Sequence, residues 1–368
     1  MGSILDALPK PGGPVGIQRI GNTCYAIAAV QCIYRNQLYM NAVLILDKLG
    51  LGGDVVTSLA TIFKYLNNPN MDGTTPRPCP GEFIQNLRRA VGRHESTFAD
   101  ENQHDCREFS ISLLDLIRES FGALTQSEAN ALVERASLTQ PEIDLLRWVG
   151  FYRPNAHAGT RICVDFGDYT LVRYCHTPIL GGQPYPILNS YLEQRDVPYA
   201  LSTKEGNLQA AIKRDLQQVL MDGDNSLYCP AIADVCPTIQ KKEFIDLPPF
   251  LRIYLKRHRK EPTKTGEPNL QKDNRRFSFP SCFDASSFFN LNSGEHYTLQ
   301  GTSCHCGTDD GGHWTFYGKI NGMWYCLNDS FVTALPNFSI ETLFGDGTTK
   351  MNAMELFYTR TSSDPPPS

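Results

Sequence analysis

A cysteine near the start of the chain has surroundings that suit thiol chemistry. Cys24 follows Gly21, Asn22 and Thr23 and begins a run that is apolar nearly all round, so we expect it in the first turn of a buried helix. The unpaired N–H groups and the dipole at such a helix end favour thiolate over thiol. An inert buried cysteine is the competing interpretation. A nucleophile at this position also needs a base, which must come from elsewhere in the chain.

His313 is the candidate base. It follows two glycines and precedes alternating aromatic residues, a pattern that is typical of a strand. Residues 323–327 indicate an adjacent strand that ends at Asn328 and Asp329. An antiparallel pair would bring Asn328 beside His313, where it could accept a hydrogen bond from imidazole Nδ1–H and hold the productive tautomer. A loop histidine and a simple Asn-Asp turn are the competing interpretations.

The elements that must position these residues change in kind along the chain. From about 22 to 150 the apolar periodicity is helical, and residues 104–121 place their apolar side chains on one face. Short β-type runs follow after about 160, with one helix predicted over 207–220. This order predicts an α+β fold with a cleft where the two halves meet. The predicted strands are 161–175, 244–256, 296–303, 313–320, 323–327 and 353–360.

Composition excludes several classes of protein. The 368 residues include 41% hydrophobic residues and carry a net charge of −5, which argues against a non-specific nucleic-acid binder. No stretch approaches the roughly 20 apolar residues of a membrane span. The first residues lack the pattern of a signal peptide. The twelve cysteines are therefore expected to be metal ligands, a nucleophile or buried thiols in an intracellular, reducing compartment, cytoplasmic and/or nuclear.

Six sequence blocks, in order, resemble the catalytic domain of the ubiquitin-specific proteases, which are papain-like cysteine deubiquitinases. The cysteine box G-L-x-N-x-G-N-T-C-Y corresponds to residues 16–25, and Q-Q-D-A-x-E-F corresponds to Gln103-His104-Asp105-Cys106-Arg107-Glu108-Phe109. The remaining blocks are 247–257, 277–280, the histidine box at 297–314 and 353–360. Each block alone is weak, but their order over 16 to 360 is specific.

The resemblance implies a domain plan and a set of roles. It implies a helical thumb at 16–150, a fingers-like β-rich region at 151–246 and a palm at 247–361, between an irregular arm at 1–15 and a proline-rich tail at 362–368. Three roles follow from the same resemblance. Cys24 would be the nucleophile, His313 the base and then the acid, and Asn328 the orienting third member, with Asp329 as its alternative.

Two departures from the family pattern concern the oxyanion and a metal. The oxyanion-stabilising asparagine of the family is replaced by Arg19, whereas Gln18 has the spacing of the oxyanion glutamine in papain-like proteases. We expect Gln18 and the Cys24 N–H to stabilise the oxyanion, with Arg19 either donating or solvated. The fingers of the family often hold Zn²⁺ between C-x-x-C pairs, which this chain lacks. We therefore expect no metal or other cofactor, although four cysteines could converge with unusual spacing: Cys163, Cys175, Cys229 and Cys236.

The substrate implied by the resemblance is ubiquitin, whose C-terminal tail is basic and ends in Gly-Gly. Asp105 and Glu108 would pair with the arginines of the tail, while Gly312 and Trp314 would line a channel that admits only glycine. A solvated helix face is the competing interpretation of the two acids.

The leading hypothesis is a monomeric, thiol-dependent deubiquitinase that cleaves the isopeptide or peptide bond after the C-terminal glycine of ubiquitin. It needs neither nucleic acid nor a membrane as a partner. A protease for a ubiquitin-like modifier, such as SUMO or Nedd8, is one alternative. A catalytically weak, ubiquitin-binding pseudoenzyme or scaffold is another.

Overall fold

The chain forms two compact units, and each unit is built from segments that are far apart in sequence. The computed structural model describes residues 2–69, 77–122, 124–157, 160–162, 166, 169–184, 189–196, 199–229, 232–262, 268–291, 294–308, 311–345 and 351–361. The first unit comprises residues 1–167, 300–339 and 350–353, and the second comprises 168–299, 340–349 and 354–368. No helix in the described part of the chain is both long and apolar enough to cross a membrane.

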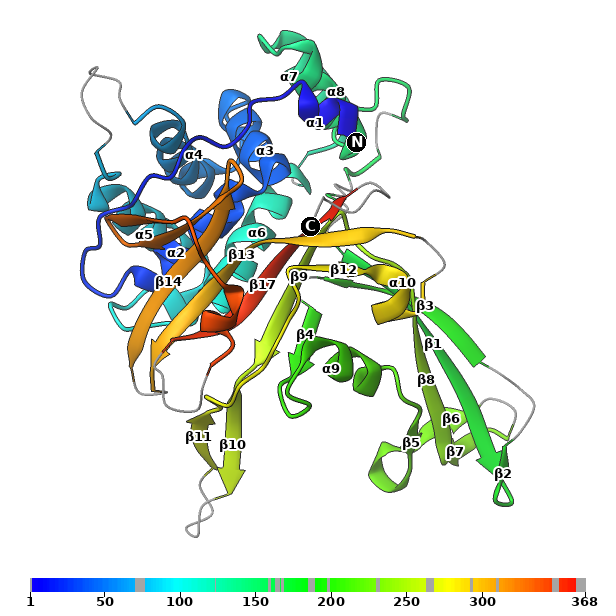
Figure 1. The fold of residues 1–368 in the computed structure, drawn as a ribbon. Coiled ribbons are helices and arrows are strands. Elements are labelled where there is room, and N and C mark those ends of the chain that lie inside the picture. The colour runs from blue at the N-terminus through cyan, green and yellow to red at the C-terminus, as the bar shows by residue number, and fades with distance from the viewer. Residues whose placement is uncertain are drawn as a thin grey trace. The chain divides into compact units, whose positions relative to one another are not determined.

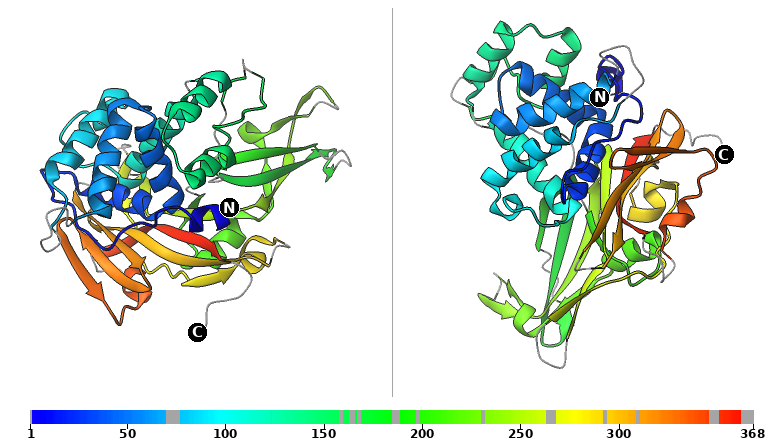
Figure 2. Two further views of the ribbon diagram at one scale, coloured as in Figure 1. Left: turned by 90° about the horizontal axis from the view of Figure 1, so that it is seen from above. Right: turned by 90° about the vertical axis from the view of Figure 1, so that its left-hand side faces the viewer.

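The first unit contains a bundle of helices with strands packed beside it, coloured blue to cyan and orange in Figures 1 and 2. Helix α2 contacts α3, α5, α6 and strand β14, so it lies at the centre of this unit. The helices are α1 (Gly2–Asp6), α2 (Cys24–Arg35), α3 (Gln37–Lys48), α4 (Gly53–Asn67), α5 (Gly81–His94), α6 (Cys106–Gly122), α7 (Gln126–Arg135) and α8 (Gln140–Trp148), with a 3₁₀ turn at Ser96–Phe98.

Local sequence explains where several of these helices begin. The side chain of Asn36 accepts from the N–H groups of Leu38 and Tyr39 and so starts α3. Thr125 and Thr139 begin α7 and α8 through capping boxes in which a glutamate three residues later bonds back to the cap. Helix α2 is different, because every residue from 24 to 34 is buried and burial on all sides stabilises it.

The strands of the first unit form an antiparallel sheet in the order β16-β15-β14-β13. They are the later part of β13 (His296–Gly307), β14 (Gly312–Ile320), β15 (Met323–Asn328) and β16 (Phe331–Leu335). Tight turns join β14 to β15 and β15 to β16. Residues 300–339 therefore belong to the same compact unit as the N-terminal helices.

The N-terminal arm differs from the expected irregular segment. Residues 2–6 form α1, and the rest of the arm is held by polar side chains of the bundle. Gln37 donates to the carbonyl groups of Leu5 and Leu8, and the guanidinium of Arg35 donates to Gly12 and Gly13. Leu8 and Val15 of the arm are also buried, so apolar contacts and these hydrogen bonds, which sequence periodicity does not reveal, hold it in place together.

The second unit is mainly β-structure. One sheet has the order β2-β1-β8-β5, with β3 also paired to β1, and β9 lies between β17 and β4. Its strands are β1 (Tyr169–Leu180), β2 (Gln183–Pro184), β3 (Asn189–Asp196), β4 (Tyr199–Ser202), β5 (Val219–Met221), β6 (Leu227–Cys229), β7 (Asp234–Cys236), β8 (Thr238–Asp246), β9 (Phe250–Lys256), β10 (His258–Pro262), β11 (Pro268–Lys272), β12 (Cys282–Asp284), the start of β13 and most of β17 (Met351–Thr361). Its helices are α9 (Leu208–Asp215) and α10 (Ala285–Phe289), with 3₁₀ turns at Gly223–Asn225 and Ile340–Leu343.

The mixed helix-and-sheet fold predicted from the sequence is confirmed, with shifts at element ends. The helix predicted over 207–220 ends at Asp215, and its last part is strand β5. The run 244–256 is divided between β8 and β9, because Pro248 and Pro249 lack the N–H that a continuous strand would need. Part of the run 161–175 lies outside the described residues, and its described strand begins at Tyr169.

Candidate active site

Cys24 is the first residue of α2 and is almost completely buried. A turn precedes it, in which Gly21 adopts the left-handed conformation with φ +60°. The Asn22 amide donates to the Glu101 carbonyl at 3.0 Å, and Thr23 Oγ1 accepts from the Ile20 N–H at 3.2 Å. Thr23 therefore orders the turn and does not cap the helix with its side chain. The polar stretch before Cys24 thus fixes where the helix begins.

His313 lies at the start of β14 and contacts Asn328 at the end of β15. The Nε2 atom of His313 is 2.6 Å from Asn328 Oδ1, and 3.8 Å from Asp329 Oδ2. The antiparallel pairing of β14 and β15 brings the two residues together, as their sequence pattern predicts. The prediction that Asn328 accepts from Nδ1–H was wrong, because Nδ1 faces Arg19 and Nε2 is the ring nitrogen that meets Asn328. Asn328 can therefore orient the ring through Nε2–H.

The electrostatics of Cys24 and His313 favour a thiolate and an imidazolium. Burial raises the pKa of Cys24, but a hydrogen bond to His313, another from the Trp314 N–H and the charges of His313 and Arg19 outweigh it, so the pKa is lowered overall. The hydrogen bond with Cys24 raises the pKa of His313 against the effect of burial, with further support from Asn328 and Asp329. Each group therefore stabilises the charged form of the other.

Asp329 occupies the turn between β15 and β16 and has a left-handed φ of +52°. Burial raises the pKa of its carboxyl group, and the charges of His313 and Arg19 offset this only in part. Its Oδ1 has no hydrogen-bond partner among the described residues. The backbone carbonyl of Asp329 accepts from the Ile17 N–H at 2.9 Å. Asp329 is thus farther from the imidazole than Asn328 and also anchors the cysteine box.

The two oxyanion candidates lie in different surroundings. The Nε of Arg19 donates to the Gly21 carbonyl at 2.7 Å, and its Nη1 lies 3.4 Å from His313 Nδ1. Gln18 is exposed, and its Oε1 accepts from the Gly81 N–H at the start of α5, at 3.4 Å. Arg19 therefore contacts the candidate base, whereas the carbonyl end of Gln18 is engaged by another helix.

The expected tail-binding residues lie along α6 and β14. Asp105 precedes α6, and its Oδ1 accepts from the N–H groups of Arg107 and Glu108, so this carboxylate also caps the helix. Glu108 is exposed in the first turn. A Cβ at Gly312 would lie 2.3 Å from both the Cys306 carbonyl and the His305 ring. Trp314, paired with His305, is 6% exposed.

Gln103 is a residue that sequence reasoning quoted but did not assign to the site. Its Oε1 accepts from the Gly312 N–H at 2.8 Å and so joins the segment before α6 to the residue before His313. The only signal in the sequence is its place at the head of the Gln103–Phe109 block. A glutamine has many roles in proteins, and residue type alone does not reveal a partner 209 positions away.

The described cysteines do not assemble a metal site. Cys175 lies on β1, whereas Cys229 and Cys236 lie on the β6–β7 hairpin and are buried. The part of the chain that the structure describes contains no group of three or more His, Cys, Asp or Glu side chains that could hold a metal ion. Cys163, the fourth candidate, lies outside the described residues. The absence of a bound zinc ion therefore stays a prediction.

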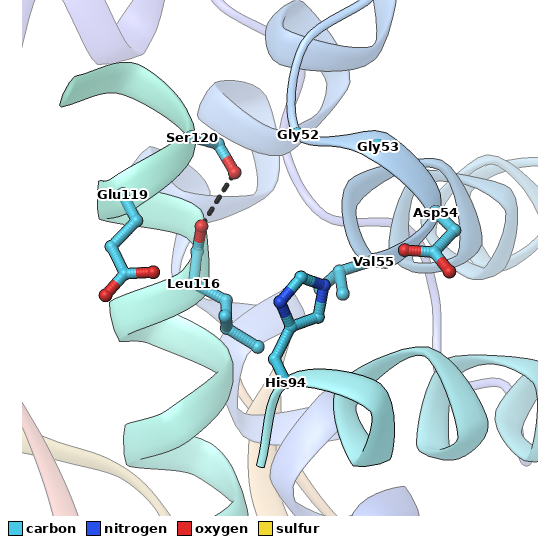
Figure 3. Close-up of a pocket in the computed structure, with 8 residues that line it drawn as sticks. All are labelled: Gly52, Gly53, Asp54, Val55, His94, Leu116, Glu119 and Ser120. Carbon is cyan, nitrogen blue, oxygen red and sulfur yellow. Dashed lines mark hydrogen bonds between the residues drawn. The ribbon is translucent and has the colours of Figure 1, made fainter. Parts of the chain in front are cut away.

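A separate cavity of about 340 Å³ lies in the helical bundle. Figure 3 shows the residues that line it. It is bounded by the start of α4, the end of α5 and the later part of α6. None of the candidate catalytic residues lines it. Its lining residues are Gly52, Gly53, Asp54, Val55, His94, Leu116, Glu119 and Ser120.

The chain is similar in sequence to known proteins over nearly its whole length. Ubiquitin carboxyl-terminal hydrolase 4 of Saccharomyces cerevisiae is 23% identical over 389 residues, covering 94% of this chain and 39% of the relative. Ubiquitin carboxyl-terminal hydrolase 2 of Homo sapiens is 25% identical over 348 residues, covering 90% of this chain and 54% of the relative. The chain thus spans about half of these relatives or less.

A solved structure and a family model agree with these relatives. The fold is similar to that of a chain in the SAGA DUB module of Ubp8, Sgf11, Sus1 and Sgf73 bound to monoubiquitin. The TM-score is 0.69 at 17% identity, covering 99% of this chain and 74% of that one. The family model for ubiquitin carboxyl-terminal hydrolase matches residues 15–358. The order of the sequence blocks, the fold and this match lead to one conclusion: the chain belongs to the ubiquitin carboxyl-terminal hydrolase family.

Proposed function

We propose that this chain is a thiol-dependent deubiquitinase that hydrolyses the bond after the C-terminal glycine of ubiquitin. The observation that carries the proposal is the contact of Cys24, at the start of α2, with a histidine that Asn328 holds at 2.6 Å. Nucleophile, base and orienting group are the three parts that a cysteine hydrolase needs. Family membership supports ubiquitin as the substrate.

The reaction follows from the charge states of the pair. The Cys24 thiolate attacks the carbonyl carbon of the terminal glycine and forms a tetrahedral oxyanion. The His313 imidazolium then protonates the leaving lysine amine as the C–N bond breaks, which leaves a thioester on Cys24. Neutral His313 next takes a proton from water, whose oxygen attacks the thioester carbonyl, and Cys24 leaves as the thiolate. Asn328 holds the ring through Nε2 during both proton transfers.

We propose that a backbone N–H and two side chains stabilise the oxyanion. The Cys24 N–H lies at a helix N-terminus, where the dipole favours negative charge. Gln18 and Arg19 are the side chains that we propose to assist it. The contact of Arg19 with His313 supports a position close to the reacting carbonyl. A single oxyanion donor typically contributes about 10²–10³-fold in rate.

The proposed path of the ubiquitin tail uses the acids of α6 and the residues before and after His313. Asp105 and Glu108 would pair with the tail arginines. Gly312 has no room for a side chain, and the buried Trp314 lies next to His313, so both support a narrow channel suited to glycine. The channel would exclude larger residues by their volume.

A second candidate function is a ubiquitin-binding protein with little turnover. The observation that favours it is Arg19, whose guanidinium lies 3.4 Å from His313 Nδ1. Arg19 stands where the resembling family has its oxyanion-stabilising asparagine, and loss of one oxyanion donor typically costs about 10²–10³-fold in rate. A protease for SUMO or Nedd8 has no specific observation in its favour. The experiment below tests it in parallel with ubiquitin.

A ubiquitin probe with a thiol-reactive group at its C-terminus tests the proposal. We expect the wild-type chain to form a covalent adduct, and Cys24→Ala to form none. Cys32→Ala is the matched control, because Cys32 is a buried thiol in the same helix and its loss should leave the adduct intact. SUMO and Nedd8 probes run in parallel should give no adduct.

The outcomes of this test separate the candidates. Binding of ubiquitin without an adduct would contradict the enzyme and favour the binding protein. An adduct with the SUMO or Nedd8 probe alone would replace ubiquitin as the substrate. The division into thumb, fingers and palm, a monomeric state and a cytoplasmic or nuclear location stay predictions.

A further inference from the structure

Strand β16 is an edge strand whose outer side has no partner among the described residues. It pairs with β15 alone and ends the sheet of the first unit. Asp329 and Ser330 form the turn, so the pair Asn328–Phe331 closes the hairpin and the hydrogen-bonded positions alternate from there. The backbone N–H and C=O groups of Val332 and Ala334 therefore point away from β15.

The side chains of β16 offer none of the usual protection of an edge strand. Phe331 is 74% exposed and Val332 is 36% exposed, and Thr333 and Ala334 are also exposed. None of the five residues of the strand is charged or a proline. Natural proteins usually guard a free edge with such residues, because an open edge recruits other strands. The strand thus has the features of a surface that receives an extended peptide.

This edge begins at the candidate active site and is held firmly there. Phe331 is the register partner of Asn328, whose side chain holds His313. The turn between them is anchored by the hydrogen bond from Ile17 to Asp329. It also fits closely against Gly16, where an added Cβ would lie 2.5 Å from the Ser330 carbonyl. The edge is therefore preorganised and continuous with the catalytic hairpin.

The edge lies on the opposite side of the hairpin from the proposed path of the ubiquitin tail. Gly312 pairs with Gly307 of β13 and bonds to Gln103 before α6. Strand β16 lies two strands away from β14, in the direction away from β13. If the ubiquitin tail passes Gly312 and ends at Cys24, the β15–β16 side of the site remains open to the leaving group, which is the conjugated protein.

We propose that β16 binds, by strand addition, an extended segment of the conjugated protein that flanks the acceptor lysine. This inference rests on the proposed function and adds the leaving-group side of the substrate. The segment would bond to the outward N–H and C=O groups of Val332 and Ala334, and Phe331 would cover an apolar side chain next to the lysine. Main-chain hydrogen bonds give such binding most of its affinity, and the uncharged strand tolerates many sequences.

The test compares two ubiquitin substrates that differ only after the scissile bond. One is ubiquitin amide-linked to aminomethylcoumarin, and the other is ubiquitin isopeptide-linked to the central lysine of an unstructured 13-residue peptide. Val332→Pro removes an outward N–H that β15 does not use, and proline is tolerated on edge strands. We expect it to lower kcat/KM for the peptide conjugate about tenfold, the loss of one to two hydrogen bonds, with the coumarin rate unchanged.

Two further variants complete the design. Phe331→Ser should lower only the peptide-conjugate rate, by a smaller factor. Met323→Ser is the matched control, because Met323 is an exposed apolar residue at the far end of β15 and should change neither rate. The coumarin rate also reports folding, so Phe331→Ser decides the question if Val332→Pro does not fold.

Each result has one meaning. No coumarin hydrolysis by the wild type would refute the proposed function, and this inference with it. Normal coumarin hydrolysis with unchanged peptide-conjugate rates in Val332→Pro and Phe331→Ser would refute the inference alone. An equal loss on both substrates in Phe331→Ser would mean damage to Asn328 and would also refute the inference. A dimer in sedimentation that Val332→Pro abolishes would make a second copy the occupant and overturn the proposal.

Discussion

At the residue scale, the chemistry depends on the charge that Cys24 and His313 share. Each shifts the pKa of the other toward the ionised pair, against the cost of burial. The pair is coupled, so the two apparent pKa values that an experiment measures belong to both groups. Asn328 and Arg19 then act on this pair from opposite ring nitrogens.

The first prediction concerns the pH dependence of Cys24 alkylation by iodoacetamide. Because the pKa of Cys24 is lowered, the rate should rise with pH at a midpoint below that of an unperturbed cysteine thiol. His313→Ala removes a hydrogen bond and a positive charge, so the midpoint should move upward. Arg19 acts on the Cys24 pKa through its charge and not through a hydrogen bond to the thiol, so Arg19→Ala should move the midpoint upward by less. An unchanged midpoint in His313→Ala would contradict the ion pair.

The second prediction separates the two polar residues beside the imidazole. Asn328 Oδ1 lies 2.6 Å from His313 Nε2, whereas Asp329 Oδ2 lies 3.8 Å away. We expect Asn328→Ala to lower kcat about 10²-fold, as loss of an oriented base does, and Asp329→Asn to lower it by less than about tenfold. Both are measured on ubiquitin–aminomethylcoumarin. A larger loss in Asp329→Asn would make Asp329 the third member.

At the element scale, the β15–β16 hairpin depends on its contact with the cysteine box. An added Cβ at Gly16 would lie 2.5 Å from the Ser330 carbonyl and 2.7 Å from that of Asp329, and neither backbone group can move freely. The third prediction is that Gly16→Ala lowers the free energy of unfolding by about 1–3 kcal/mol and also lowers kcat, since the turn next to Asn328 must shift.

Gly13→Ala is the control for this element, because a Cβ at Gly13 would meet nothing within 4 Å. Thermal unfolding and kcat are measured for both variants. Equal stability of the two would show that the hairpin accommodates the extra methyl group, and the proposed dependence would be wrong.

At the scale of the whole molecule, the second unit contains none of the candidate catalytic residues. Its described cysteines do not form a metal site, and the C-x-x-C pairs of the family are missing. The fourth prediction is therefore that the purified chain holds much less than one zinc ion. The chelator 1,10-phenanthroline should leave Tm and kcat unchanged, with the non-chelating 1,7 isomer as control. A Tm that falls only with the chelator would mean that the four cysteines converge.

Much of the fold was predictable where periodicity is strong. The apolar run after Cys24 predicts α2, and the alternating aromatics predict β14 and β15 closely. Prediction failed where contacts distant in sequence decide the structure. Hydrogen bonds from Gln37 and Arg35 hold the arm at 1–15, and part of the run predicted as one helix over 207–220 pairs with β8 as β5.

The sequence alone determined the family, the helix that begins at Cys24 and the strands that bring His313 to Asn328, because motif order and periodicity are local properties of the chain. Tertiary structure alone decided which ring nitrogen meets Asn328, where Gln18 and Arg19 lie, and that Gln103 bonds to Gly312. It also decided that β16 ends its sheet among the described residues. These facts depend on which atoms approach through space, and neighbours along the chain do not specify them.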